Sequence, residues 1–108
     1  MTFKIAVYGI VKNESAVICR WYDTAREADA IYVTDTGSSD DTEKTLLRIA
    51  EEDPELNVFS AVFLPFRFDL ARNFALTQVP DSIDYAVFLD ADEVLEPGWY
   101  RKLQDVLN

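Results

Sequence analysis

The chain has 108 residues, of which 49% are apolar, and carries a formal net charge of −10. This length allows one domain with a hydrophobic core, so we treat residues 1–108 as a single domain, and the negative charge argues against nucleic acid and anionic membranes as partners. The sequence has no histidine, which excludes imidazole zinc sites and catalysis by a Ser-His-Asp triad.

The beginning of the chain predicts a strand followed by a helix. Residues 3–11 are rich in β-branched and aromatic residues and predict the first strand. Residues 14–29 carry apolar residues at helical spacing, and Asn13 is expected to cap that helix. Cys19 falls in this helix, where we expect it to be a small core or boundary residue and not a nucleophile.

The next elements alternate in the same way. Residues 30–34 predict the second strand, which ends at Asp35, and the small and polar residues 36–42 predict a turn. A second helix follows and ends before Pro54, where a helix cannot continue. Residues 57–64 predict the third strand.

The last elements complete an alternating pattern. Asp69 is expected to cap a short helix, residues 85–89 predict the fourth strand, and Pro97 suits the first position of a final helix. This order calls for an α/β fold of three layers. Its centre would be a mostly parallel sheet of about four strands joined by right-handed crossovers.

Three acidic residues, Asp90, Asp92 and Glu93, follow the fourth predicted strand at once. A short apolar run such as 85–89 predicts a strand that is buried on both faces. Ligands of open α/β sheets bind just past the carboxyl ends of such strands, and carboxylate oxygens suit Mg²⁺ or Mn²⁺. A solvated acidic turn is the alternative interpretation, because Asp-x-Asp is a short motif.

Other polar residues are expected at the same edge of the sheet. Parallel strands all end along one edge, which brings together residues that are far apart in the sequence. This convergence favours a binding site over a chance grouping. The residues concerned are Asn13, Asp35, Asp40, Arg72 and the acidic group 90–93.

Four segments of the chain resemble the motifs of one known family. They are Val11-Lys12-Asn13-Glu14, the run from Val33 to Thr42, Ala71-Arg72-Asn73, and the run from Phe88 to Glu93. Together they resemble the N-terminal, nucleotide-sugar-binding half of a family 2 glycosyltransferase, whose GT-A fold is Rossmann-like. The likeness covers nearly the whole chain, although Asp40-Asp41-Thr42 stands where the family usually has Asp-Gly-Thr.

The resemblance implies inverting transfer of a sugar from a nucleoside diphosphate to an unknown acceptor, be it a saccharide, a lipid or a protein. It implies that Asp35 accepts hydrogen bonds from the base or ribose, that Asp90 faces the ribose, and that Asp92 and Asp90 ligate Mn²⁺ or Mg²⁺. Glu93 is expected either to be solvated or to support these ligands. The implied nucleotide-sugar-binding residues are Val11, Asn13, Glu14, Asp35, Asp40, Arg72, Asp90 and Ala91.

Only 15 residues follow Glu93, and they predict a single helix. Members of the family carry their carboxylate base well beyond the metal motif, so we expect the acceptor-binding half to be absent and the chain to bind donor with little transfer. Trp99, Tyr100 and Leu103 are expected to leave apolar surface uncovered, which predicts self-association through the C-terminal side. A non-catalytic nucleotide- and metal-binding module or assembly subunit is the alternative.

Two other α/β families share part of the pattern. Asp90-Ala91-Asp92 resembles the first motif of haloacid-dehalogenase-like phosphatases, but that motif stands on their first strand and here follows the fourth. A receiver-like phosphoacceptor domain needs paired acids after the first strand, where this chain has Lys12-Asn13-Glu14. Both families fit the sequence less well than the glycosyltransferases.

Nothing in the sequence predicts export or membrane insertion. Cys19 is the only cysteine, which fits a reducing compartment, and no stretch approaches the roughly 18 apolar residues of a membrane span. The apolar run that follows Lys4 lacks a small-residue cleavage site. We therefore expect a cytoplasmic protein without a signal peptide.

Overall fold

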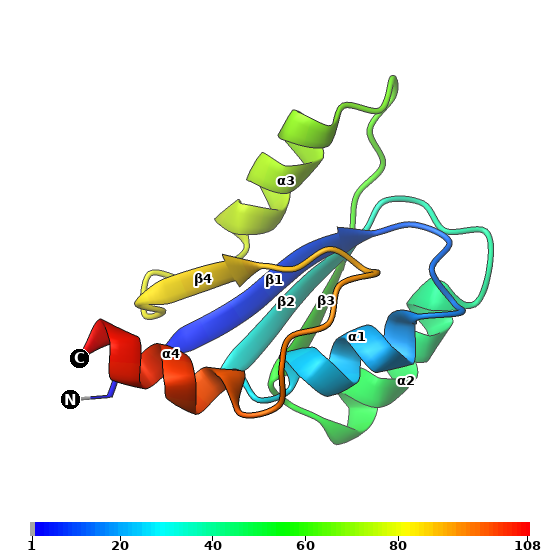
Figure 1. The fold of residues 1–108 in the computed structure, drawn as a ribbon. Coiled ribbons are helices and arrows are strands. Elements are labelled where there is room, and N and C mark those ends of the chain that lie inside the picture. Colours follow the sequence, from blue (N-terminus) through cyan, green and yellow to red (C-terminus); the bar gives the residue numbers. More distant parts are fainter. Residues whose placement is uncertain (1) are drawn as a thin grey trace.

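The computed structural model describes residues 2–108 and contains four strands and four helices that alternate along the chain (Figure 1). The strands form one sheet in the order β3-β2-β1-β4, and every neighbouring pair is parallel. The predicted α/β fold with a parallel four-stranded sheet is therefore confirmed. The strands are β1 (Ile5–Val11), β2 (Ala30–Asp35), β3 (Leu56–Ser60) and β4 (Tyr85–Phe88).

The helices cover both faces of the sheet, which gives the three layers that were expected. Helices α1 (Ile18–Ala25), α2 (Thr42–Glu52) and α4 (Trp99–Leu107) lie on one face, and α3 (Phe68–Thr77) lies on the other (Figure 1). Side chains alternate between the faces of a strand, so every second residue of β1 points to α1. Within residues 2–108, no helix is long and apolar enough to cross a membrane.

Helix α1 is joined to the sheet through a buried tryptophan. The indole Nε1 of Trp21 donates a hydrogen bond of 2.9 Å to the carbonyl oxygen of Leu89, which directly follows β4. Gly9 on β1 makes room for this contact, because a Cβ atom there would lie 2.7 Å from the Leu89 oxygen. The position of α1 therefore determines where the chain runs after β4.

The same helix also holds the segment that leads to α4. The hydroxyl of Thr24 donates to the Leu95 carbonyl oxygen at 2.9 Å and accepts from the Leu95 amide at 2.8 Å. The Trp99 indole donates to the Thr24 carbonyl oxygen at 2.8 Å, and the carboxylate of Glu27, just beyond the end of the helix, accepts from the Gly98 amide at 2.9 Å. Residues 89–99 are thus attached to α1 along its length.

Asp40, just before the N-cap residue Asp41, holds the first turn of α2. Its Oδ1 atom accepts hydrogen bonds from the amide (2.9 Å) and hydroxyl (2.5 Å) of Thr42, and its Oδ2 atom accepts one from the Ser15 amide at 3.2 Å. Chiefly the bonds from Thr42, and then those from Ser15, lower the pKa of Asp40 from 3.8 to about 2. A charged Asp40 is thus part of the start of α2.

Several local predictions at the first helix are wrong. Helix α1 begins at Ile18, four residues after the predicted start, because Glu14–Val17 form a turn in which the amides of Val17 and Ile18 share the Glu14 carbonyl oxygen. Asn13 is therefore too far from the helix to cap it. Cys19 is exposed and is not the core or boundary residue that was expected.

The starts of the last two helices also differ from the prediction. Helix α3 begins at Phe68 and makes no side-chain cap, so Asp69 lies inside its first turn, where its carboxylate pairs with the Arg67 guanidinium at 2.8 Å. Pro97 precedes α4, which begins only after Gly98, a residue with φ of 87°. Glycine adopts this left-handed conformation without the strain of a side chain.

Strand β4 is not buried on both faces, which corrects the prediction from its apolar sequence. It pairs only with β1 and forms one edge of the sheet, so Tyr85 is 43% exposed. Phe88 is better covered, because its ring packs edge-to-face on Tyr8 with ring centres 5.2 Å apart. The apolar run reflects these aromatic contacts and not a central position in the sheet.

The C-terminal helix is better covered than its sequence suggested. Trp99 is buried in the core, and Tyr100 and Leu103 pack against that core. The side-chain amide of Gln104 exchanges hydrogen bonds of 3.0 and 2.6 Å with the main chain of Phe3, which fixes α4 beside the start of β1. Self-association through this side stays a prediction, and these aromatic residues do not support it.

We predict that Thr24→Val lowers the free energy of unfolding by about 1–3 kcal/mol, because valine keeps the shape but leaves the Leu95 amide and carbonyl without their partner. Thr34→Val is the matched control. The Thr34 hydroxyl is buried without a hydrogen-bond partner among residues 2–108, so its removal should leave stability unchanged or raise it. Denaturant unfolding followed by tryptophan fluorescence measures both, and equal losses in the two variants would contradict the role given to Thr24.

We also predict that Asp40→Asn changes the acid sensitivity of the fold. The folded-state pKa of Asp40 lies below its ordinary value, so its contribution to stability is present above about pH 4 and is lost as the pH falls to about 2. The variant should therefore show a flatter loss of stability over this range than the wild type. Asp41→Asn, at a side chain that makes no cap hydrogen bond, should keep the wild-type slope, and identical slopes in all three proteins would refute this assignment.

Candidate functional site

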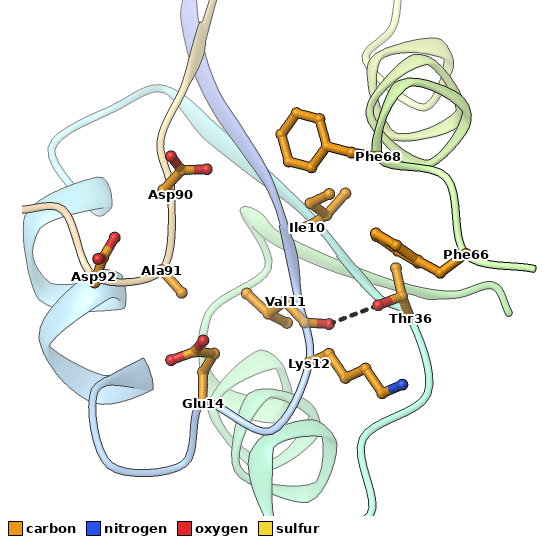
Figure 2. Close-up of a pocket in the computed structure, with 10 residues that line it drawn as sticks. All are labelled: Ile10, Val11, Lys12, Glu14, Thr36, Phe66, Phe68, Asp90, Ala91 and Asp92. Atoms are coloured by element: carbon orange, nitrogen blue, oxygen red, sulfur yellow. Dashed lines mark hydrogen bonds between the residues drawn. The ribbon is translucent and has the colours of Figure 1, made fainter. Parts of the chain in front are cut away.

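A cavity of about 410 Å³ opens where β1, β2 and β4 end (Figure 2). It lies at the edge of the sheet where the sequence predicted a binding site, since parallel strands end there together. Its walls come from four separate parts of the chain. The lining residues are Ile10, Val11, Lys12, Glu14, Thr36, Phe66, Phe68, Asp90, Ala91 and Asp92.

One side of the cavity is acidic. Figure 2 shows Glu14, Asp90 and Asp92 on the same side of the end of β1, with the small side chain of Ala91 pointing toward that strand. Val11, at the end of β1, lies beside them. Five of the predicted site residues therefore line the cavity, namely Val11, Glu14, Asp90, Ala91 and Asp92. This arrangement gathers carboxylate oxygens from the loops after β1 and β4.

The acidic turn is held by hydrogen bonds from both of its ends. The Glu93 carboxylate accepts a hydrogen bond of 2.9 Å from the Asp90 amide, and the Glu93 amide donates one of 3.0 Å to the Asp90 carbonyl oxygen. The Arg20 guanidinium on α1 donates to the Asp92 carbonyl oxygen at 3.3 Å. Of the two alternatives for Glu93, these bonds favour support of the aspartates, because the Glu93 carboxylate closes the turn that carries Asp90 and Asp92.

The surroundings of Asp90 disfavour its charged form. Partial burial raises the pKa of Asp90, and the nearby charges of Glu93 and Asp92 raise it further. The positive charge of Arg72 acts in the opposite direction. A cation placed between these carboxylates would relieve the same repulsion.

Asp35 lies behind the cavity and not on its wall. It is 1% exposed, and its Oδ1 atom accepts hydrogen bonds from the amides of Gly37 (2.9 Å) and Ser38 (2.8 Å). Its Oδ2 atom accepts a further bond of 2.6 Å from the Ser38 hydroxyl. The carboxylate thus shapes the turn after β2, and its contact with a nucleotide stays a prediction.

Asn13 joins the loop after β1 to the loop after β2. Its side-chain oxygen accepts hydrogen bonds from the backbone amides of Ser39 (2.7 Å) and Asp40 (3.3 Å). The backbone amide of Asn13 donates to the Ser38 hydroxyl at 2.9 Å. Beside it, the Glu14 amide donates to the Thr42 hydroxyl at 2.8 Å. Asn13 and Asp40, both predicted to bind nucleotide, lie outside the cavity lining and fix the loop that carries Glu14.

Arg72 is also absent from the cavity lining, although its charge reaches Asp90. Its guanidinium carbon lies 4.7 Å from the centre of the Phe88 ring, close enough for a cation–π contact. The surface ion pair that is common for an arginine on such a helix is not formed among residues 2–108. Arg72 therefore lies beside the site, on the side of α3.

The sequence interpretation missed half of the cavity wall. Thr36 follows Asp35 at the end of β2, so the rule that placed Asp35 at the edge applied equally to its neighbour. Phe66 and Phe68 lie in the loop before α3 and at its first position, and their aromatic character in a surface segment was the available signal. The other lining residues not predicted are Ile10 and Lys12.

The carboxylates of the cavity meet only part of what a divalent cation requires. Within residues 2–108, no three acidic, cysteine or histidine side chains are grouped closely enough to enclose a metal ion. Mg²⁺ in nucleotide sites is commonly held by one or two carboxylates, with substrate phosphates and water completing the shell. Asp90 and Asp92 fit a site of this kind, in which two carboxylates share the cation with phosphates and water, and do not fit a site made of protein ligands alone.

Comparison with known proteins agrees with this geometry. The family model described as "Glycosyl transferase family 2" matches residues 7–108, whereas no curated protein matches the chain. The matched range includes β2, β3 and β4, β1 from Val7 onward, and every residue that lines the cavity. Because the match covers nearly the whole chain and the predicted fold is present, the chain belongs to glycosyl transferase family 2.

Proposed function

We propose that the chain binds a nucleoside diphosphate sugar in the cavity at the ends of β1 and β4, for inverting transfer of the sugar to an acceptor. The observation that carries this proposal is the pair Asp90 and Asp92 on the wall of that cavity, in a chain of a glycosyltransferase family. The diphosphate would lie on the acidic side, with Mn²⁺ or Mg²⁺ between it and the two aspartates.

The charges of the cavity make the cation necessary for binding. Glu14, Asp90 and Asp92 outnumber the single positive charge of Lys12 on the cavity wall, so like charges would repel a free diphosphate from the acidic side. A bound divalent cation supplies positive charge that offsets this repulsion and stabilises the departing diphosphate. The role of Glu93 and Arg20 is to hold the turn so that both aspartates face the cavity.

The remaining predicted residues support the donor in two ways. Val11 and Ala91 line the cavity and bring the main chain to its wall. Asn13, Asp35 and Asp40 hold the two neighbouring loops through their hydrogen bonds, so we propose that they act on the nucleotide mainly through the shape of those loops.

We predict that UDP or GDP stabilises the protein only when Mn²⁺ or Mg²⁺ is present. At a ligand concentration a hundredfold above its dissociation constant, binding adds about 2.7 kcal/mol to the free energy of unfolding. Thermal unfolding with each nucleotide, in the presence of the cation or of a chelator, measures this difference. Equal shifts with cation and with chelator would remove the cation from the proposal.

A further prediction concerns Asp92, the proposed ligand of the cation. Asp92→Ala should abolish the cation-dependent part of nucleotide binding and leave the fold intact, because the Asp92 side chain makes no hydrogen bond or ion pair among residues 2–108. Asp105→Ala is the matched control, since Asp105 is an exposed acid on α4 and its removal changes the net charge equally. Calorimetric titration of both variants with Mn²⁺ and UDP or GDP tests this, and unchanged binding by Asp92→Ala would contradict the assignment.

A further inference from the structure

The side of the cavity opposite the acidic residues carries two aromatic rings and Ile10, with Thr36 and Lys12 beside them. Figure 2 shows Phe66, Phe68 and Ile10 on one side of the end of β1 and the aspartates on the other. Phe66 is 51% exposed and Phe68 is 49% exposed, which is a high value for side chains of this size. Two half-exposed phenylalanines at one cavity form an apolar surface against which a ligand can pack.

The Phe68 ring is fixed from behind by a row of aromatic contacts. Its centre lies 6.2 Å from that of Phe88, with the planes at 84°, and Phe88 packs in turn on Tyr8 at 5.2 Å. Edge-to-face pairs of this kind hold the orientation of the ring, so little conformational entropy is lost when a ligand binds. Phe68 therefore presents an ordered ring to the cavity, although about half of it is exposed.

Resting on the proposed function, we propose that Phe68 is the stacking platform for the nucleobase of the bound nucleoside diphosphate. With the diphosphate on the acidic side, either the base or the transferred sugar must lie against the aromatic side. The side chains of Ile10, Phe66 and Phe68 offer no hydrogen-bonding group, and only Thr36 and Lys12 beside them do, so most hydroxyls of a sugar covered by the rings would lose their partners. A planar base needs only a ring face, so the aromatic side suits the base.

Stacking of this kind places few demands on the identity of the base. Every base has a π face, so stacking contributes similarly to purines and pyrimidines. The Asp35 carboxylate, which the sequence predicted to bind the base or ribose, already accepts three hydrogen bonds inside its own loop. UDP and GDP should therefore depend on Phe68 to a similar degree.

The test compares ligands with and without a base on Phe68→Leu, which keeps an apolar side chain but removes the ring. In the presence of Mn²⁺, the variant should bind UDP and GDP about 5- to 150-fold more weakly than the wild type, as expected for loss of one stacking contact. Its affinity for inorganic pyrophosphate should stay unchanged. Phe63→Leu is the matched control, because Phe63 lies in the loop that leads to Phe68, packs on Phe74 and does not line the cavity.

Proton NMR adds a direct readout of stacking. With Mg²⁺ as the cation, which does not broaden the signals as Mn²⁺ does, base protons of bound UDP should shift upfield with the wild type and with Phe63→Leu, and this shift should be absent with Phe68→Leu. Unchanged UDP affinity in Phe68→Leu, or an equal loss of pyrophosphate affinity, would overturn the stacking role while the proposed function stands. If the wild-type protein bound none of pyrophosphate, UDP and GDP, the proposed function itself would be overturned.

Discussion

The hydrogen bond from the Trp21 indole to the Leu89 carbonyl oxygen holds the chain where β4 ends and the acidic turn begins. It depends on Gly9, since a side chain there would meet both partners. Helix α1 then follows the segment as far as α4, through Arg20 and Thr24 among others. One helix, packed on the sheet, thus determines where the two aspartates lie.

The site combines two kinds of support that come from different elements. On the acidic side, the loops are tied by the partly buried hydrogen bonds of Asp35 and the exposed ones of Asn13. On the other side, aromatic packing from Phe88 fixes Phe68. Both keep the cavity wall in place before a ligand arrives, which lowers the cost of ordering it on binding. The acidic side favours a cation with a diphosphate, and the aromatic side favours a ring.

The alternation of apolar strands with amphipathic helices was enough to predict the parallel sheet and the edge at which Asp90 and Asp92 lie. The direction of each polar side chain was not predictable, because a residue at a strand end can face the cavity or, like Asp35, its own loop. Phe68 was missed because apolar residues are usually assigned to a core. The prediction that the strand of Tyr85 is buried on both faces was wrong, because the local sequence pattern does not reveal the order of the strands, which puts β4 at the edge of the sheet.

The most direct test of the account is to locate a bound cation by its effect on nearby amide signals. Mn²⁺ added in small amounts with UDP or GDP to the ¹⁵N-labelled protein broadens the signals of residues around it. We predict that the amides of Glu14 and of residues 90–93 broaden first, because these residues carry or adjoin the acidic side of the cavity. A second acidic groove, between α1 and α2, is lined by Asp23, Glu52 and Asp53. Broadening that begins there, with the signals of residues 90–93 unaffected, would contradict the account.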